Sequence, residues 1–127
     1  MNEATTVSFV ATSRAEAARD FYANKLGFCF AGEDRFALLF RMPDGGKLRV
    51  QKVEQFEPQT FTVLGWEVED ISEAVQALAA KGVEFVRVPN LPQDGDGVWS
   101  APDGTRVAWF KDPDGNTLSL AEHPATL

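Results

Sequence analysis

Two stretches of this chain repeat each other: Phe36-Ala37-Leu38-Leu39-Phe40-Arg41-Met42-Pro43-Asp44-Gly45 and Arg106-Val107-Ala108-Trp109-Phe110-Lys111-Asp112-Pro113-Asp114-Gly115. Each begins as an apolar strand, runs into a Pro-Asp-Gly turn and is followed by a second short apolar strand, at 48–50 or 118–120. Proline presets φ for such a turn, and glycine accepts the positive φ that the turn needs. The repetition predicts one supersecondary unit used twice, since neither copy buries its apolar face alone.

The segment before the first copy predicts a strand and a helix. Residues 6–12 have strand character, and Ser13 with Glu16 three positions later forms a predicted capping box. Apolar residues then recur at helical spacing until Gly27, which is the expected C-terminal stop.

The segment before the second copy has the same order. Residues 61–68 are a predicted strand, Asp70 with Glu73 caps a second helix, and Gly82 ends it. Each half therefore reads strand, helix and three strands, a βαβββ unit. The loop 89–97, rich in proline and glycine, is expected to be exposed.

Length and composition predict one domain over residues 1–127, with a first module at about 5–53, a linker at 54–60 and a second module at about 61–123. A formal net charge of −7 argues against a nucleic-acid partner. No run of apolar residues is long enough to span a bilayer, so no membrane partner is expected. Cys29, the single cysteine, is interpreted as a small buried residue and fits a cytoplasmic, reducing compartment.

An ordered set of motifs resembles the vicinal oxygen chelate superfamily, which includes glyoxalases, bleomycin resistance proteins and extradiol dioxygenases. The motifs are Ala18-Arg19-Asp20-Phe21-Tyr22 through Leu26-Gly27-Phe28, then Val68-Glu69-Asp70-Ile71, then Phe110-Lys111-Asp112-Pro113-Asp114-Gly115-Asn116. The resemblance implies an α+β fold of two βαβββ modules in tandem, forming a cupped mixed sheet with a central cleft. It also implies a homodimer.

Metal-dependent members of this superfamily place His, Gln or Glu at four positions, and the resemblance carries these onto Val7, Arg49, Val63 and Ser119. Valine has no donor atom for a metal, and the guanidinium of arginine has no acceptor. A neutral serine hydroxyl alone is a poor ligand for a divalent ion. We therefore expect no metal and no cofactor. His123, the single histidine, is interpreted as an exposed residue near the C-terminus.

Strand alternation predicts which other side chains share the face of these four positions. The expected ligand-binding residues are Val7, Phe9, Arg49, Gln51, Val63, Glu67, Trp99, Trp109 and Ser119. Most are apolar or aromatic and a few are polar, a combination typical of small-molecule sites. Trp66 has the opposite parity and is expected to pack against a helix. Alternatively, Trp109 is ordinary core, and Arg49 simply pairs with Glu67.

The predicted binding residues and the missing metal ligands favour two hypotheses about function. The first is a non-enzymatic protein that binds an aromatic or cationic small molecule in an apolar cleft without metal, for resistance or sequestration. The second is a glyoxalase-like lyase or isomerase, or a dioxygenase-type enzyme, either metal-free with Glu67 as general base or with a non-standard metal site. A regulatory or partner-binding module is a third reading, which no specific residue favours.

Overall fold

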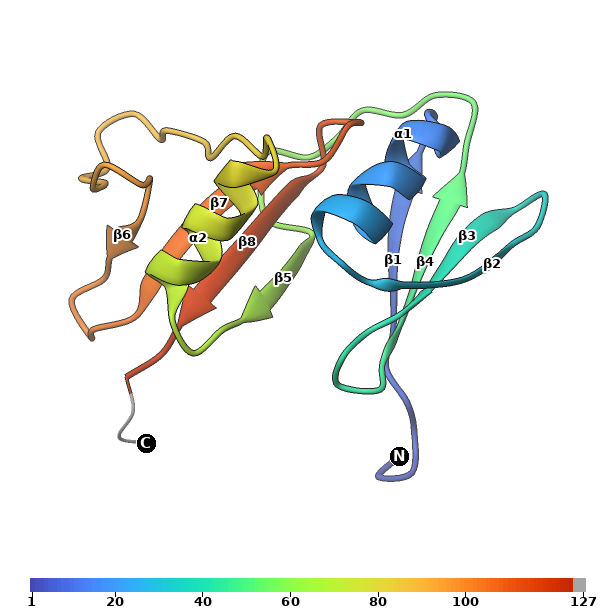
Figure 1. Ribbon diagram of the computed structural model, residues 1–127, viewed down its shortest axis with the longest axis horizontal. Coiled ribbons are helices and arrows are strands. Elements are labelled where there is room, and N and C mark those ends of the chain that lie inside the picture. Colours follow the sequence, from blue (N-terminus) through green and yellow to red (C-terminus); the bar gives the residue numbers. More distant parts are fainter. Residues whose placement is uncertain (125–127) are drawn as a thin grey trace. The chain divides into compact units, whose positions relative to one another are not determined.

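The computed structural model describes residues 1–124 and contains two four-stranded sheets, each with a helix against one face (Figure 1). The elements of the first half are β1 (Val7–Thr12), α1 (Ala15–Asp20), its π-helical continuation η1 (Phe21–Lys25), β2 (Cys29–Glu33), β3 (Ala37–Arg41) and β4 (Lys47–Lys52). Those of the second half are β5 (Leu64–Glu67), α2 (Ile71–Ala80), β6 (Trp99–Ser100), β7 (Arg106–Lys111) and β8 (Thr117–Glu122). The βαβββ order predicted for both halves is confirmed.

The two sheets have the same topology. Sheet A has the strand order β1-β4-β3-β2 and sheet B the order β5-β8-β7-β6. In each sheet the first and last strands of the half pair in parallel, and the other neighbours are antiparallel. Each sheet is therefore mixed. No helix in the described part of the chain is long and apolar enough to cross a membrane.

The chain divides into two compact units. Unit 1 comprises Met1–Pro58 together with Asp112–Asn116, and unit 2 comprises Gln59–Lys111 and Thr117–Leu127. The turn between β7 and β8 thus belongs by its contacts to unit 1, although the sequence repeat assigns it to the second half.

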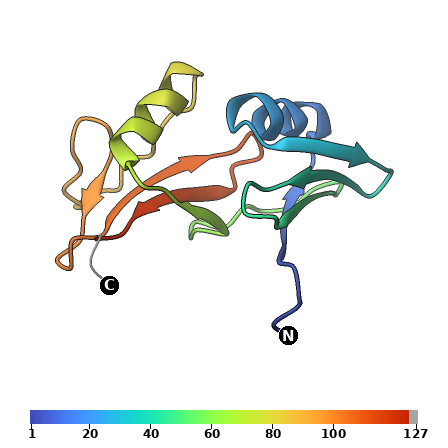
Figure 2. The same ribbon diagram turned by 60° about the horizontal axis from the view of Figure 1, so that its bottom comes forward.

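One face of each sheet lies against the helix of its unit (Figure 2), and alternating residues of the strands form the core there. In unit 1, Leu38, Phe40, Leu48 and Val50 are fully buried, and the ring of Tyr22 lies 5.9 Å from that of Phe40. In unit 2 the equivalent fully buried residues are Ala108, Phe110 and Leu118, with Ile71 and Val75 of α2 against them. Burial of a side chain of this size contributes about 1.5–3 kcal/mol.

The caps of the two helices differ from each other. Asp70 caps α2 as predicted, because its Oδ1 accepts from the backbone N–H of Glu73 at 3.0 Å, and Gly82 follows with φ 90°. The predicted cap of α1 by Ser13 is wrong: the N-cap residue is Arg14 and makes no side-chain cap bond. Ser13 is unavailable because its N–H and hydroxyl both donate to the Asp114 carboxylate. Gly27, with φ 79°, ends the helical segment as predicted.

Two other details differ from the sequence-based expectations. The strand expected at 61–68 is shorter, because β5 covers only Leu64–Glu67. Cys29 is exposed rather than buried, because β2 is an edge strand of sheet A.

The chain has a third Pro-Asp-Gly turn, Pro102-Asp103-Gly104, which the two-copy reading missed. It joins β6 to β7, and the Thr105 N–H bond to Asp103 lowers the pKa of that carboxyl. Asp44 accepts in the same way from the N–H of Gly46 in the first turn. In both turns the central aspartate stabilises its own turn.

The β7–β8 turn contains two aspartates with different roles: Asp112 stabilises the turn, and Asp114 bonds to residues outside it. Asp112 accepts the N–H groups of Asp114 and Asn116, at 3.0 and 2.9 Å. Asp114 is thereby free to accept from Thr12 Oγ1 at 2.5 Å and from Ser13 N at 2.8 Å. The extra aspartate at the first turn position therefore makes a tertiary contact possible.

Tyr22 completes this network inside unit 1. Its hydroxyl is buried and donates to Asp112 Oδ2 at 2.6 Å, and Asn116 Nδ2 donates to the same oxygen at 2.8 Å. Burial raises the pKa of Tyr22 well above its ordinary value of 10.0, and the negative charge of Asp112 raises it further.

Alkaline titration tests the burial of Tyr22, which is the single tyrosine, so tyrosinate absorbance reports on it alone. A raised folded-state pKa means that the folded chain holds the phenolic proton more tightly than the unfolded chain. The resulting stabilisation is complete below about pH 10 and is lost as the pH rises from there towards the folded-state pKa. We expect tyrosinate absorbance to appear together with unfolding followed by circular dichroism.

The matched variant is Tyr22→Phe, which keeps the ring and removes the hydroxyl. It is expected to lower the free energy of unfolding by about 1–2 kcal/mol at neutral pH and to remove the loss of stability above about pH 10. Ionisation near pH 10 in a protein that remains folded would contradict the buried hydrogen bond.

The turn aspartates provide a second test. Asp114→Ala removes the acceptor of three hydrogen bonds to Thr12 and Ser13, and we expect the free energy of unfolding to fall by about 2–3 kcal/mol. Asp44→Ala removes one exposed bond within its own turn, so a loss below about 1 kcal/mol is expected. Urea unfolding measures both, and equal losses would show that Asp114 acts only within its turn.

Candidate functional site

Each sheet has one face packed on its helix and a second face, here called the open face, that no helix among the described residues of its unit covers. On sheet A the open face carries Val7, Phe9, Arg49 and Gln51, four of the predicted binding residues. The register pairs Phe9 with Arg49 across β1 and β4. Phe9 is 53% exposed and Val7 40%, so two apolar side chains of this face meet solvent.

Sheet B brings together the other predicted residues on its own open face. Trp109 pairs with Ser119, and Ser119 pairs with Gly65, so these residues form one row across three strands. Glu67 lies two residues beyond Gly65 on the same face. Val63 lies directly before β5, and its N–H donates to Thr117 O.

Trp99 and Trp109, here called the tryptophan pair, lie against each other on this open face. Their ring centroids are 6.2 Å apart and their planes are inclined by 30°, a stacked arrangement. Both side chains are half-buried. Indole rings present a large apolar surface that prefers offset stacking with other aromatic rings.

Trp66 lies on the opposite face of sheet B, as its parity predicts. Its ring stacks on that of Phe110, a fully buried core residue, at 6.4 Å. Trp66 is half-buried and packs on the face of sheet B opposite the tryptophan pair.

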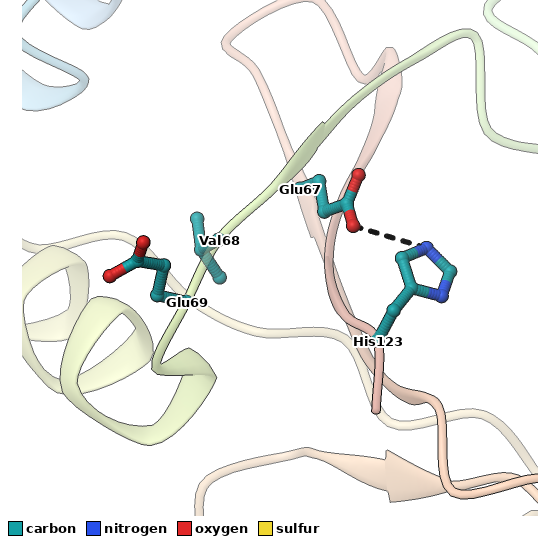
Figure 3. Close-up of a pocket in the computed structure, with 4 residues that line it drawn as sticks. All are labelled: Glu67, Val68, Glu69 and His123. Carbon is teal, nitrogen blue, oxygen red and sulfur yellow. Dashed lines mark ion pairs between the residues drawn. The ribbon is translucent and has the colours of Figure 1, made fainter. Parts of the chain in front are cut away.

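Glu67 faces the single histidine of the chain, as Figure 3 shows. His123 Nε2 lies 3.9 Å from Glu67 Oε1, and His123 Nδ1 lies 3.4 Å from Thr105 Oγ1. Glu67, Val68, Glu69 and His123 line an open hollow of about 550 Å³. In this hollow the Glu69 carboxylate points away from that of Glu67 (Figure 3).

His123 is exposed, as expected, but the sequence did not indicate its contact with Glu67. The only available signal was its separation of four residues from Ser119, which keeps the parity of β8. Glu122 points to the other side, where it accepts from the backbone N–H of Ile71 at 2.9 Å. Glu122 and His123 therefore point to different sides of β8.

The four positions carried over by resemblance do not suit a metal. Val7 and Val63 are apolar, Arg49 offers donors only, and Ser119 offers a single hydroxyl. Within residues 1–124, no three His, Cys, Asp or Glu side chains gather in a way that would hold a metal ion. No chemical step can be assigned to a metal at these positions. The expected pairing of Arg49 with Glu67 and the expected central cleft both stay predictions.

Comparison with known proteins agrees with this fold. A family model for the glyoxalase/bleomycin resistance protein/dioxygenase superfamily matches residues 4–120. No curated protein matches the chain.

Solved structures resemble the chain over nearly its whole length. A glyoxalase family protein from Bacillus anthracis has 20% identity and a TM-score of 0.74, with 95% of each chain covered. A superfamily member from Sphaerobacter thermophilus has 25% identity and a TM-score of 0.73, with 94% of this chain and 97% of that chain covered. Lactoylglutathione lyase from Agrobacterium tumefaciens has 14% identity and a TM-score of 0.72, with 94% and 92% covered. The same fold is indicated by the repeated βαβββ units, by the family model that matches residues 4–120 and by these solved structures. The chain belongs to the glyoxalase/bleomycin resistance protein/dioxygenase superfamily.

Proposed function

We propose that this protein binds an aromatic or cationic small molecule on its open sheet faces without metal, in a resistance or sequestration role. The observation that carries the proposal is the tryptophan pair, two stacked indoles on a face that no helix in the described part of unit 2 covers. Small-molecule sites combine apolar and aromatic walls with a few polar groups that fix orientation. On sheet B, Ser119 supplies one such polar group next to Trp109, and Glu67 supplies another on β5, two strands from Trp109.

The open face of sheet A supports the same proposal. Arg49 and Gln51 stand there among Val7 and Phe9, again a few polar groups on an apolar surface. The 53% exposure of Phe9 favours a second copy of the chain that would cover it, and we propose a homodimer. The single exposed cysteine, Cys29, fits a reducing compartment, and we propose that the protein is cytoplasmic.

A metal-free enzyme is the second candidate. The contact of Glu67 with His123 favours it, because a carboxylate beside an imidazole is an arrangement that can move a proton. The test is the cleavage of lactoylglutathione, with and without added divalent metal. The binding proposal expects no turnover above the rate without protein, whereas turnover that is lost in Glu67→Gln would establish the enzyme.

Ligand binding is tested with ethidium, a planar aromatic cation. We expect it to quench tryptophan fluorescence, and we expect Trp109→Leu to weaken its affinity by about two- to tenfold through the loss of aromatic contact. Trp66→Phe is the matched control, because Trp66 lies on the opposite face of sheet B and its replacement should leave the affinity unchanged. Equal effects of the two variants, or no quenching, would contradict the proposal.

Metal content provides a separate test. Protein purified without a chelator is expected to contain far less than one Zn, Fe, Mn or Ni per chain in elemental analysis, and added metal should not raise ethidium affinity. The reason is the chemistry of Val7, Arg49, Val63 and Ser119, which provide one hydroxyl among four positions. A stoichiometric metal would overturn the metal-free assignment.

A further inference from the structure

The strand register of sheet B arranges the polar and aromatic groups of its open face in two rows. The first row runs Trp99, Val107, Ala121 and Glu67, because these residues pair in sequence across β6, β7, β8 and β5. The second row runs Trp109, Ser119 and Gly65 across β7, β8 and β5. The aromatic rings thus stand at one end of the rows and the carboxylate at the other.

Between the tryptophan pair and Glu67, the strands β8 and β5 carry only small side chains on this face. Ala121, Ser119 and Gly65 are the residues of β8 and β5 there, and none has a side chain larger than a hydroxymethyl group. A Cβ atom at Gly65 would lie 2.6 Å from Ser119 Oγ and 3.3 Å from Ser119 O, so a side chain at this position would crowd Ser119. Between the tryptophan pair and Glu67, the largest side chain of the two rows is that of Val107, so an extended ligand can lie along them without meeting a long or aromatic side chain.

Charge on this face also differs between its ends. Lys111 is the basic side chain of β7 that shares the face, and it lies beyond Trp109, where it donates to Thr117 Oγ1 at 3.3 Å. Glu67 lies at the β5 end of this face, and its ion pair with His123 has a separation of 3.9 Å between Glu67 Oε1 and His123 Nε2. In unit 2 as a whole, carboxylates outnumber basic groups: Glu67, Glu69, Asp70, Glu73, Glu84, Asp94, Asp96, Asp103 and Glu122 against Lys81, Arg87, Arg106 and Lys111. A cation is therefore favoured at the Glu67 end.

We propose that this face binds an elongated ligand with an aromatic ring at the tryptophan pair and an ammonium group at Glu67. Neighbouring strands are about 4.8 Å apart, so the two strand spacings from Trp109 to the strand of Glu67 set a ring-to-nitrogen separation of about 10 Å. The inference rests on the proposed function and deepens it, since it gives the ligand a length and a polarity. It needs only residues of unit 2.

Two series of compounds test the length. One is a set of ω-phenylalkylammonium ions whose chain grows by one methylene at a time, and the other is the set of matching ω-phenylalkanols. Each methylene raises the affinity of both series through apolar burial, so the ratio of ammonium to alcohol affinity isolates the charge. We expect this ratio to peak at about two- to fivefold when the ring and nitrogen are about 10 Å apart. Isothermal titration calorimetry measures the affinity of each compound in both series.

Three variants test which residues produce the preference for ammonium over alcohol. Glu67→Gln should reduce the ratio to about one at every chain length, whereas Glu69→Gln, which removes the same charge from a side chain that points elsewhere, should leave it unchanged. Trp99→Leu should weaken both series equally and leave the ratio intact.

The outcomes separate the inference from the proposed function. A ratio that does not depend on chain length, or that persists in Glu67→Gln, overturns the inference, while continued aromatic binding leaves the proposed function standing. If neither series binds, the proposed function and the inference both fail.

Discussion

The buried hydrogen bond from Tyr22 to Asp112, 2.6 Å long, is the contact on which unit 1 depends. A buried carboxylate is tolerated only when its oxygens are satisfied, and leaving one unpaired costs several kcal/mol. Asp112 meets this requirement with Tyr22, Asn116 and two backbone N–H groups. The same bonds hold the β7–β8 turn within unit 1, and so they connect a segment of the second sequence repeat to the core of the first.

The packing of each sheet explains why the candidate site lies on its open face. Fully buried residues such as Phe40 and Phe110 commit one face to the core, where any change of volume is costly. The open face is free of that constraint, so its composition can change without loss of the fold. In this chain it carries exposed Phe9 on sheet A and the tryptophan pair on sheet B.

Membership of the superfamily therefore fixes the scaffold and leaves the chemistry open, because function depends on the residues of the site rather than on the fold. Valine at two of the four positions, with arginine and serine at the others, removes the ligands that a divalent metal requires. On the open face of sheet B, beside Ser119, the tryptophan pair offers an apolar surface on which an aromatic ring can stack. The proposed aromatic binding depends on only a few outward-facing side chains of this scaffold.

Local sequence patterns were enough to predict the two βαβββ units, the cap of α2 by Asp70 and the faces on which the candidate residues lie, because strand parity, turn chemistry and helix caps are local properties. They also placed both members of the tryptophan pair on one face, although the stacking of the two rings depends on the pairing of β6 with β7. The folded chain was needed to show that Ser13 binds Asp114 instead of capping α1, that Tyr22 reaches Asp112 and that His123 faces Glu67. These contacts join residues far apart in the chain, and one Pro-Asp-Gly motif can either stabilise its own turn or reach a distant strand, so no local pattern distinguishes the two.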